Sequence, residues 1–124
     1  MIYKKGTMLV PSGPRHDNKQ KHLHIICNDT CDLGFNLLVS VSSFYDGCDS
    51  TCELDSGDHP SVTHLSYVFY AKAKIYKAAD LENGFVNEIL IPKPDMEDEV
   101  FERVEAGICT SLDTPRKIKK YIGC

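Results

Sequence analysis

The sequence predicts one mainly β domain, a small and strongly bent β-barrel that is closed by helices at its C-terminal end. Its length of 124 residues suits a single core. Apolar and polar side chains alternate in short segments between residues 7 and 75, and the apolar spacing becomes helical after residue 95. We therefore expect a single domain over residues 1–124, with the barrel over about 4–76 and a helical C-terminal part over about 78–124.

The first strand is expected close to the N-terminus. Gly6 precedes the sequence TMLV and Pro11 stops that run, which predicts a strand over about 7–10. The following segment, PSGPRHDNKQK over 11–21, combines prolines with glycine, serine, asparagine and aspartate. Such a composition is typical of a loop, so a long polar loop should separate the first two strands.

Three further segments have the features of strands. The sequence HLHIIC over 22–27 is followed by Asn28 and Asp29, which favour a turn. The sequence FNLLVSVSS over 35–43 ends in alternating valine and serine, as in a half-buried sheet. After a second polar loop, SYVFYAKAKI over 66–75 is the most β-prone segment of the chain.

Two helices are expected after residue 94. Asp95 can cap the first, because the apolar residues that follow it have helical spacing: Met96, Val100, Phe101, Val104 and Ile108. Thr114 as a cap, with Pro115 at the first position, predicts a second, shorter helix.

Composition excludes a transmembrane protein and argues against a disordered one. The mean hydropathy is −0.26, and no apolar run approaches the roughly 18 residues that a membrane span needs. Hydrophobic residues make up 42% of the chain, enough for a modest core. The N-terminal sequence MIYKKGTMLV lacks the long apolar stretch and the cleavage site of a secretion signal, so we expect a cytoplasmic protein.

The net charge of −4 is unevenly distributed. Residues 1–24 carry +4, from five basic residues and one aspartate, and residues 115–124 carry another +4, from four basic residues. The segment between them therefore carries −12. This balance argues against non-specific coating of nucleic acid, whereas the basic ends either contact a few phosphates or are simply solvated faces.

The cysteines permit a second interpretation. A disulfide framework is not expected in a cytoplasmic chain, because the cytosol keeps thiols reduced. Two pairs with three intervening residues have a spacing within the range of zinc ligands, namely Cys27 with Cys31 and Cys48 with Cys52. These four residues could stabilise a structural zinc domain, and Cys109 and Cys124 are expected to be ordinary packing and tail residues.

Reactive polar side chains concentrate in the first loop and its exit, at the end of the third strand, and around the sequence GDHP. They are Arg15, His16, Lys21, His22, His24, Ser42, Ser43, Asp58, His59, His64 and Ser66. Histidines exchange protons near neutral pH, and cations stabilise charge that develops on a phosphate. These residue types suit metal-free phosphodiester cleavage. The sequence contains neither a GxSxG elbow nor a glycine-rich phosphate loop.

The order of these segments resembles a known family. The sequences KKGTMLV, KHLHIICND, LLVSVSS and SYVFYAKAKI resemble, in that order, the MazF/PemK/Kid toxin family. The resemblance covers about residues 4–75. It implies an SH3-like barrel of the MazF/PemK/CcdB type and a metal-independent endoribonuclease that needs no cofactor. It also implies a homodimer with RNA lying across it and a cognate antitoxin protein that blocks the site.

The resemblance also assigns positions. Gly6 matches the glycine that opens the first strand. Lys21 stands where the family has a catalytic arginine, with His22 in place of the proline that follows it, and Ser42 stands where the family has a catalytic threonine or serine. This chain departs from the family in lacking the arginine-proline pair and in carrying the histidine-containing segment GDHPSVTH.

From these observations we expect an RNA-cleaving toxin-like domain. The catalytic candidates are Lys21, Ser42, His59 and His64, and the substrate-binding candidates are Arg15, His16, His22 and Ser43. A base drawn from His59, His64 or His22 would remove the proton of a ribose 2′-hydroxyl, Lys21 and Arg15 would stabilise the charge on the phosphate, and a second histidine would protonate the leaving oxygen.

Two other functions stay open at this stage. The same barrel could be a non-catalytic binding or inhibitor module, because the acidic middle of the chain suits the capture of a basic protein. The cysteine pairs instead favour the zinc-stabilised structural domain.

Overall fold

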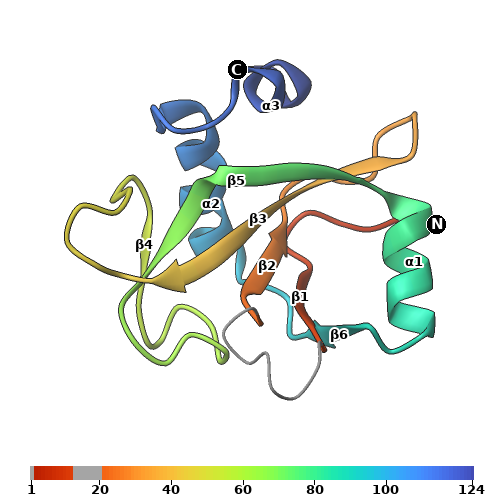
Figure 1. The fold of residues 1–124 in the computed structure, drawn as a ribbon, viewed down its shortest axis with the longest axis horizontal. Helices are drawn as coiled ribbons and strands as arrows, with labels where there is room; N and C mark the ends of the chain where they lie inside the picture. Colours follow the sequence, from red (N-terminus) through yellow and green to blue (C-terminus); the bar gives the residue numbers. More distant parts are fainter. Residues whose placement is uncertain (1, 13–20) are drawn as a thin grey trace.

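The computed structural model describes residues 2–12 and 21–124 and consists of one curled antiparallel sheet with three helices. Figure 1 shows the sheet as a half-barrel. In chain order, the elements are β1 (Met8–Pro11), β2 (Leu23–Ile26), β3 (Phe35–Ser43), β4 (Glu53–Leu54), β5 (Ser66–Lys77), α1 (Ala78–Val86), β6 (Leu90–Lys93), α2 (Asp98–Thr110) and α3 (Arg116–Ile122). The expected mainly β architecture with C-terminal helices is confirmed.

The strand order across the sheet is β4-β5-β3-β2-β1-β6. The four strands expected from alternation correspond to β1, β2, β3 and β5, whereas β4 and β6 were not expected. β6 lies within the part expected to be helical, where it pairs with β1 from Met8 opposite Lys93 to Pro11 opposite Leu90. Pro92 is tolerated there because β6 is an edge strand.

The long pair β3 and β5 runs across the whole molecule (Figure 1). Their register shifts between Leu38 and Ser40, and at the far end Ser43 lies opposite Ser66. Residues that lie directly opposite each other point to the same face of a sheet. The pairing therefore brings the polar end of β3 against the start of β5.

One face of the sheet carries the larger of two hydrophobic cores, which we call the large core. It contains side chains of β2, β3 and β5 together with Val104 and Ile108 of α2 and Ile118 of α3. Tyr70 is fully buried in it and donates a hydrogen bond of 2.8 Å to the carbonyl oxygen of Val104. Gly107 leaves the space that the Tyr70 ring occupies, because a Cβ atom there would clash with the Tyr70 hydroxyl.

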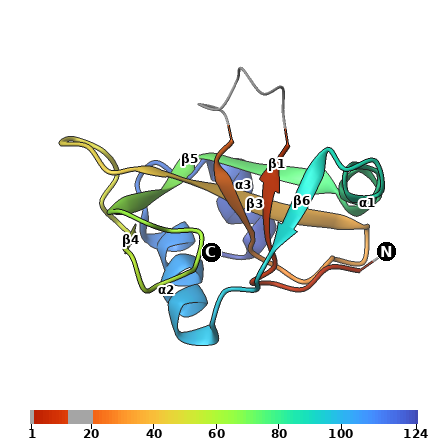
Figure 2. The ribbon, with the colours of Figure 1, turned by 90° about the horizontal axis from the view of Figure 1, so that it is seen from below.

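The opposite face carries a smaller core beside α1. Leu9, Ile26, Leu38 and Leu81 are buried there, with half-buried aromatic residues around them. Figure 2 shows α1 at one end of the sheet and α2 at a separate position on the large-core side. Among the described residues, α1 therefore packs against the small core at one end of the sheet.

Both expected helix caps are wrong. α2 begins at Asp98 after Glu97, and α3 begins at Arg116 after Pro115, and neither cap residue makes a side-chain hydrogen bond. The backbone N–H of Met96 donates to the carbonyl oxygen of Gly6, 2.9 Å away. Because this bond ties Met96 to the N-terminal segment, the helix starts after it rather than at Asp95.

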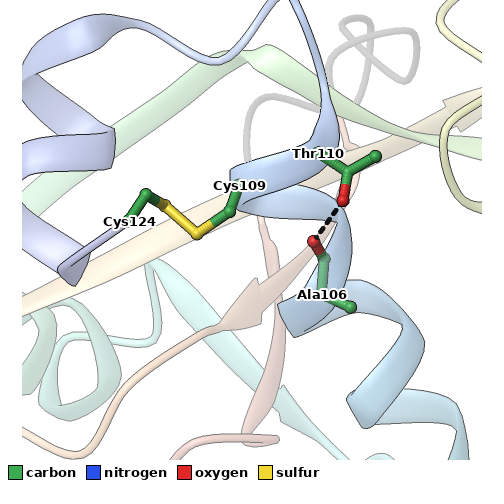
Figure 3. The surroundings of a disulfide bond; sticks show 4 residues. All are labelled: Ala106, Cys109, Thr110 and Cys124. Carbon is green, nitrogen blue, oxygen red and sulfur yellow. Dashed lines mark hydrogen bonds between the residues drawn. A yellow bond between two sulfur atoms is a disulfide. The ribbon is translucent and has the colours of Figure 1, made fainter.

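Cys109 and Cys124 form a disulfide bond between the end of α2 and the residue after Gly123 (Figure 3). The expectation that they are packing and tail residues is therefore wrong. That expectation followed from the reducing cytosol and took no account of geometry, although α3 folds back so that the two Cα atoms are 5.4 Å apart.

The other four cysteines are free. Cys27 and Cys52 are buried in the large core, and Cys31 and Cys48 are half-buried. Burial raises the pKa of the Cys27 thiol, which therefore stays protonated. Within residues 2–12 and 21–124 no three His, Cys, Asp or Glu side chains are grouped so that they could hold a metal ion, and the zinc interpretation is therefore not supported.

Candidate functional site

A polar cavity of about 330 Å³ lies where β3 ends, β2 begins and the segment before β5 crosses them. We call it the strand-end pocket. Its lining comprises a lysine, two histidines, five hydroxyl side chains and three apolar side chains: Lys21, His22, Leu23, Val41, Ser42, Ser43, Ser61, Val62, Thr63, His64 and Ser66.

Strand pairing positions these side chains. Leu23 lies opposite Val41, and both belong to the large core, so the pocket has a buried apolar wall. Lys21 and His22 immediately precede β2, whereas Ser42 and Ser43 end β3. Residues from two polar segments far apart in the sequence therefore meet at one end of the sheet.

Ser43 and His64 form the closest polar pair in the pocket. The Oγ of Ser43 lies 2.7 Å from Nε2 of His64, and the Oγ1 of Thr63 lies 3.3 Å from Nδ1 of the same ring. Ser66 adds a third restraint, because its hydroxyl donates to the carbonyl oxygen of His64 at 2.9 Å. His64 is solvent-exposed yet held at both ring nitrogens, which is the geometry of a positioned acid or base.

The charge of the strand-end pocket differs from that of the chain as a whole. Its described lining contains Lys21 and two histidines but no carboxylate. By contrast, aspartate or glutamate side chains line a cavity beside α2, a cavity beside α1 and a cavity around His59. An anionic group such as a phosphate is therefore best accommodated in the strand-end pocket.

His59 lies elsewhere. Its side chain is buried, its Nε2–H donates to the carbonyl oxygen of Pro94 at 2.6 Å, and its Nδ1 accepts from the N–H of Ser61 at 3.0 Å. It lines a separate cavity that also contains Asp95 and Glu97. The catalytic candidates Lys21 and Ser42 line the strand-end pocket and His59 does not, and both ring nitrogens of His59 are hydrogen-bonded to backbone groups.

His59 instead fixes the segment that carries His64. Its carbonyl oxygen accepts from the N–H of Val62 at 2.9 Å, and its ring holds the N–H of Ser61. The bond to Pro94 anchors this turn to the chain just before α2. His59 is therefore a positioning residue for one wall of the strand-end pocket.

Of the other expected site residues, Lys21, His22, Ser42, Ser43 and His64 line the same pocket. Arg15 and His16 lie outside the described residues. Sequence reasoning named His64 and Ser43 separately but missed their direct contact. The signal that could have found it is the pairing of Ser43 with Ser66, two residues after His64.

Two further observations concern the class of protein. In the part of the chain that the structure describes, the helices are too short or too polar to span a bilayer. Comparison with known proteins gave no match, either to a family model or to a curated protein sequence.

Proposed function

We propose that the strand-end pocket binds a phosphate of single-stranded RNA and cleaves the adjacent phosphodiester bond without a metal ion. The observation that carries this proposal is the meeting of Lys21, His22 and His64 in one cavity that has no carboxylate in its described lining. A cation, a potential acid and a potential base are the groups that this reaction requires.

The contact between Ser43 and His64 identifies His64 as the general base of the proposed reaction. With its Nε2 unprotonated, His64 accepts the proton of the ribose 2′-hydroxyl, which takes the place of the Ser43 hydroxyl at that nitrogen. The 2′-oxygen then bonds to phosphorus while the bond from phosphorus to the 5′-oxygen breaks. Protonated His22 gives its proton to the leaving 5′-oxygen, and the products are a 2′,3′-cyclic phosphate and a 5′-hydroxyl.

Lys21 and the hydroxyl side chains have supporting roles in this proposal. The ammonium group of Lys21 balances the charge that accumulates on the phosphate oxygens, because a lysine in a partly enclosed site stabilises a developing oxyanion. Ser42 and Ser43 orient the phosphate by hydrogen bonds from the end of β3. The histidines exchange their protons with water after each turnover, which restores the starting state.

The resemblance to the MazF/PemK/Kid toxins supplies the parts of the proposal that the pocket alone does not address. On that basis the barrel is of the SH3-like type, the substrate is RNA in the cytoplasm, and the chain acts as a homodimer that a cognate antitoxin blocks. An oligomer measurement by light scattering tests the dimer: twice the chain mass of 13.9 kDa is expected, and a monomer would contradict it.

The direct test is cleavage of an end-labelled single-stranded RNA of mixed sequence in the presence of EDTA. We expect fragments with cyclic phosphate and 5′-hydroxyl ends, and a rate at least about 100-fold lower for His64→Ala, since loss of a general base costs that much or more. His24→Asn is the matched control, because His24 lies on β2 but outside the strand-end pocket.

Three results would contradict the proposal. They are cleavage that EDTA abolishes, a His64→Ala variant that cleaves at the parental rate, and a folded wild-type chain that leaves every RNA intact. The last result would favour the non-catalytic binding module.

A further inference from the structure

A second cavity, of about 430 Å³, lies on the opposite face of the sheet beside α1. We call it the α1 pocket. Its lining comes from β1, β2, β3, β5, α1 and the segment leading into β6: Leu9, Pro11, His24, Leu38, Tyr76, Asp80, Leu81, Asn83, Gly84, Asn87, Ile89 and Leu90. The volume is within the range of roughly 300–1,000 Å³ that is usual for small-molecule sites.

The floor of the α1 pocket is made of leucines. Leu9, Leu38 and Leu81 are exposed by only 1%, 3% and 2% of their surface, so they form a fixed apolar bed. Leu90 closes one side, which Gly84 permits, because a Cβ atom at residue 84 would lie 2.6 Å from Leu90 Cδ1. A hydrocarbon or aromatic group placed on this bed would be removed from water.

Two polar side chains of the pocket offer hydrogen-bond acceptors rather than donors. The Nδ1–H of His24 donates to the carbonyl oxygen of His22 at 2.8 Å, so in the neutral ring Nε2 carries only a lone pair. Burial lowers the pKa of His24, which keeps the ring neutral at pH 7. Asn87 donates its amide to the carbonyl oxygen of Asn83 at 2.9 Å, which leaves its own oxygen as an acceptor.

The charge at the rim is negative. Asp80 lines the pocket from the first turn of α1, and it makes no salt bridge with any residue that the structure describes. No lysine or arginine is found among the described lining residues. Lys74 lies above the ring of Tyr76, 5.5 Å from its centroid, but does not line the pocket.

We propose that the α1 pocket binds a small organic amine, with its apolar body on the leucine bed and its ammonium group beside Asp80. The leucine bed fixes the apolar body, and the single carboxylate together with the acceptors selects a donor of positive charge. This site lies on the face opposite the strand-end pocket, and the proposal does not depend on RNA cleavage.

The test uses three probes with the same aromatic body, 2-phenylethylamine, 2-phenylethanol and phenylacetate, titrated into the full chain at pH 7 and followed by two-dimensional ¹H–¹⁵N NMR. We expect the amine to give saturable shifts of the backbone amides of Leu81, Asn83 and Asn87. We also expect it to bind about fivefold more tightly than the alcohol, the ratio that corresponds to a partly exposed ion pair of about 1 kcal/mol. Phenylacetate should bind most weakly.

Two substitutions test whether Asp80 is the residue that binds the ammonium group. Asp80→Asn should lower the affinity for the amine about fivefold and leave the affinity for the alcohol unchanged. Asp98→Asn is the control, because Asp98 also lies in the first turn of a helix, α2, but outside the α1 pocket, and it should change neither affinity.

The proposal is overturned if phenylacetate binds as tightly as the amine, if Asp80→Asn binds the amine as well as the parent does, or if the shifts map to other residues. Absence of saturable shifts up to millimolar probe would also overturn it. The comparison among the three probes uses the wild-type chain alone, so the proposal stays testable even if a variant does not fold.

Discussion

The two faces of the sheet bury side chains to different extents and present different chemistry. On one face α2 and α3 cover the large core, and the strand-end pocket at its margin is lined by hydroxyls, histidines and Lys21. On the other face α1 covers a smaller core, and the adjacent pocket has a leucine floor and Asp80 at its rim. The comparison shows two pockets of opposite character, one lined by Lys21 and two histidines with no carboxylate among its described residues, the other lined by Asp80 with no described lysine or arginine.

The largest expected change in stability concerns the disulfide bond on the large-core side. The bond between Cys109 and Cys124 closes a separation of 15 residues, for which the chain-entropy account gives about 3 kcal/mol. The double variant Cys109→Ser with Cys124→Ser should lose about that much free energy of unfolding in urea. RNA cleavage should persist in the folded variant, because neither cysteine lines the strand-end pocket.

Cys48→Ser serves as the control for this prediction, because Cys48 is free and half-buried. It should leave the stability nearly unchanged. A double variant as stable as the parent would show that the bond contributes nothing in solution.

Replacing one glycine beside each core by alanine compares how closely the two cores are packed. Gly107→Ala should lower the free energy of unfolding by about 2–3 kcal/mol, because the added methyl group clashes with Tyr70 and threatens its hydrogen bond to Val104. Gly84→Ala on α1 meets the half-exposed side chain of Leu90, which can move, and alanine is a better helix former. It should cost less than about 1 kcal/mol.

Urea unfolding of the two glycine variants measures the difference. Equal losses at Gly107 and Gly84 would remove the distinction between the enclosed contact with Tyr70 and the adjustable contact with Leu90.

The His59→Ala variant tests whether His59 positions the pocket wall or takes part in the reaction. We expect it to lower the free energy of unfolding by about 1–2 kcal/mol, because it leaves the Pro94 carbonyl and the Ser61 N–H without their partner. The rate of RNA cleavage by the folded fraction should fall far less than in His64→Ala. A loss of activity as complete as that of His64→Ala, with unchanged stability, would return His59 to the list of catalytic residues.

The smallest expected effect is a pH dependence of stability, which arises from His24 on the small-core face. The pKa of His24 is lowered from its ordinary value of 6.5 by burial, so below that pH the unfolded chain takes up a proton more readily than the folded one. Stability due to this residue is complete above about pH 6.5 and is lost as the pH falls toward the folded pKa.

The corresponding measurement is urea unfolding at several pH values between 7.5 and 5. His24→Gln should flatten the decline in stability across this interval, because it removes the group whose pKa is lowered by burial. Parallel curves for His24→Gln and the parent would contradict the assignment.

The sequence predicts the parts of the fold that follow from local pattern. Flanking Gly6 and Pro11 mark β1, an apolar run that ends in a turn signal marks β2, and alternation marks β3 and β5. β4 has two residues, and β6 contains Pro92, so neither shows a strand pattern, and their existence depends on the partner strand. The cap at Asp95 fails for a similar reason, because a bond from Met96 to Gly6 decides where α2 begins.

The residue types that line the candidate site could be read from the sequence, but their arrangement could not. Lys21, His22 and His64 were recognised as groups that can act on a phosphate, and they line one pocket. The contact of Ser43 with His64 depends on the register of β3 and β5, which alternation does not specify. The position of His59 was not predictable from local pattern, because its ring is hydrogen-bonded to the carbonyl oxygen of Pro94, 35 residues further along the chain.

The most direct test of the central claim is to locate bound RNA on the molecule. A short 2′-O-methylated RNA, which cannot be cleaved through its 2′-oxygen, is titrated into the ¹⁵N-labelled chain, and backbone amide shifts are recorded. We predict saturable shifts at Ser43, Thr63 and His64 and unchanged signals at Leu81 and Asn83. Shifts confined to the α1 pocket, or none at all, would contradict the assignment of RNA to the strand-end pocket.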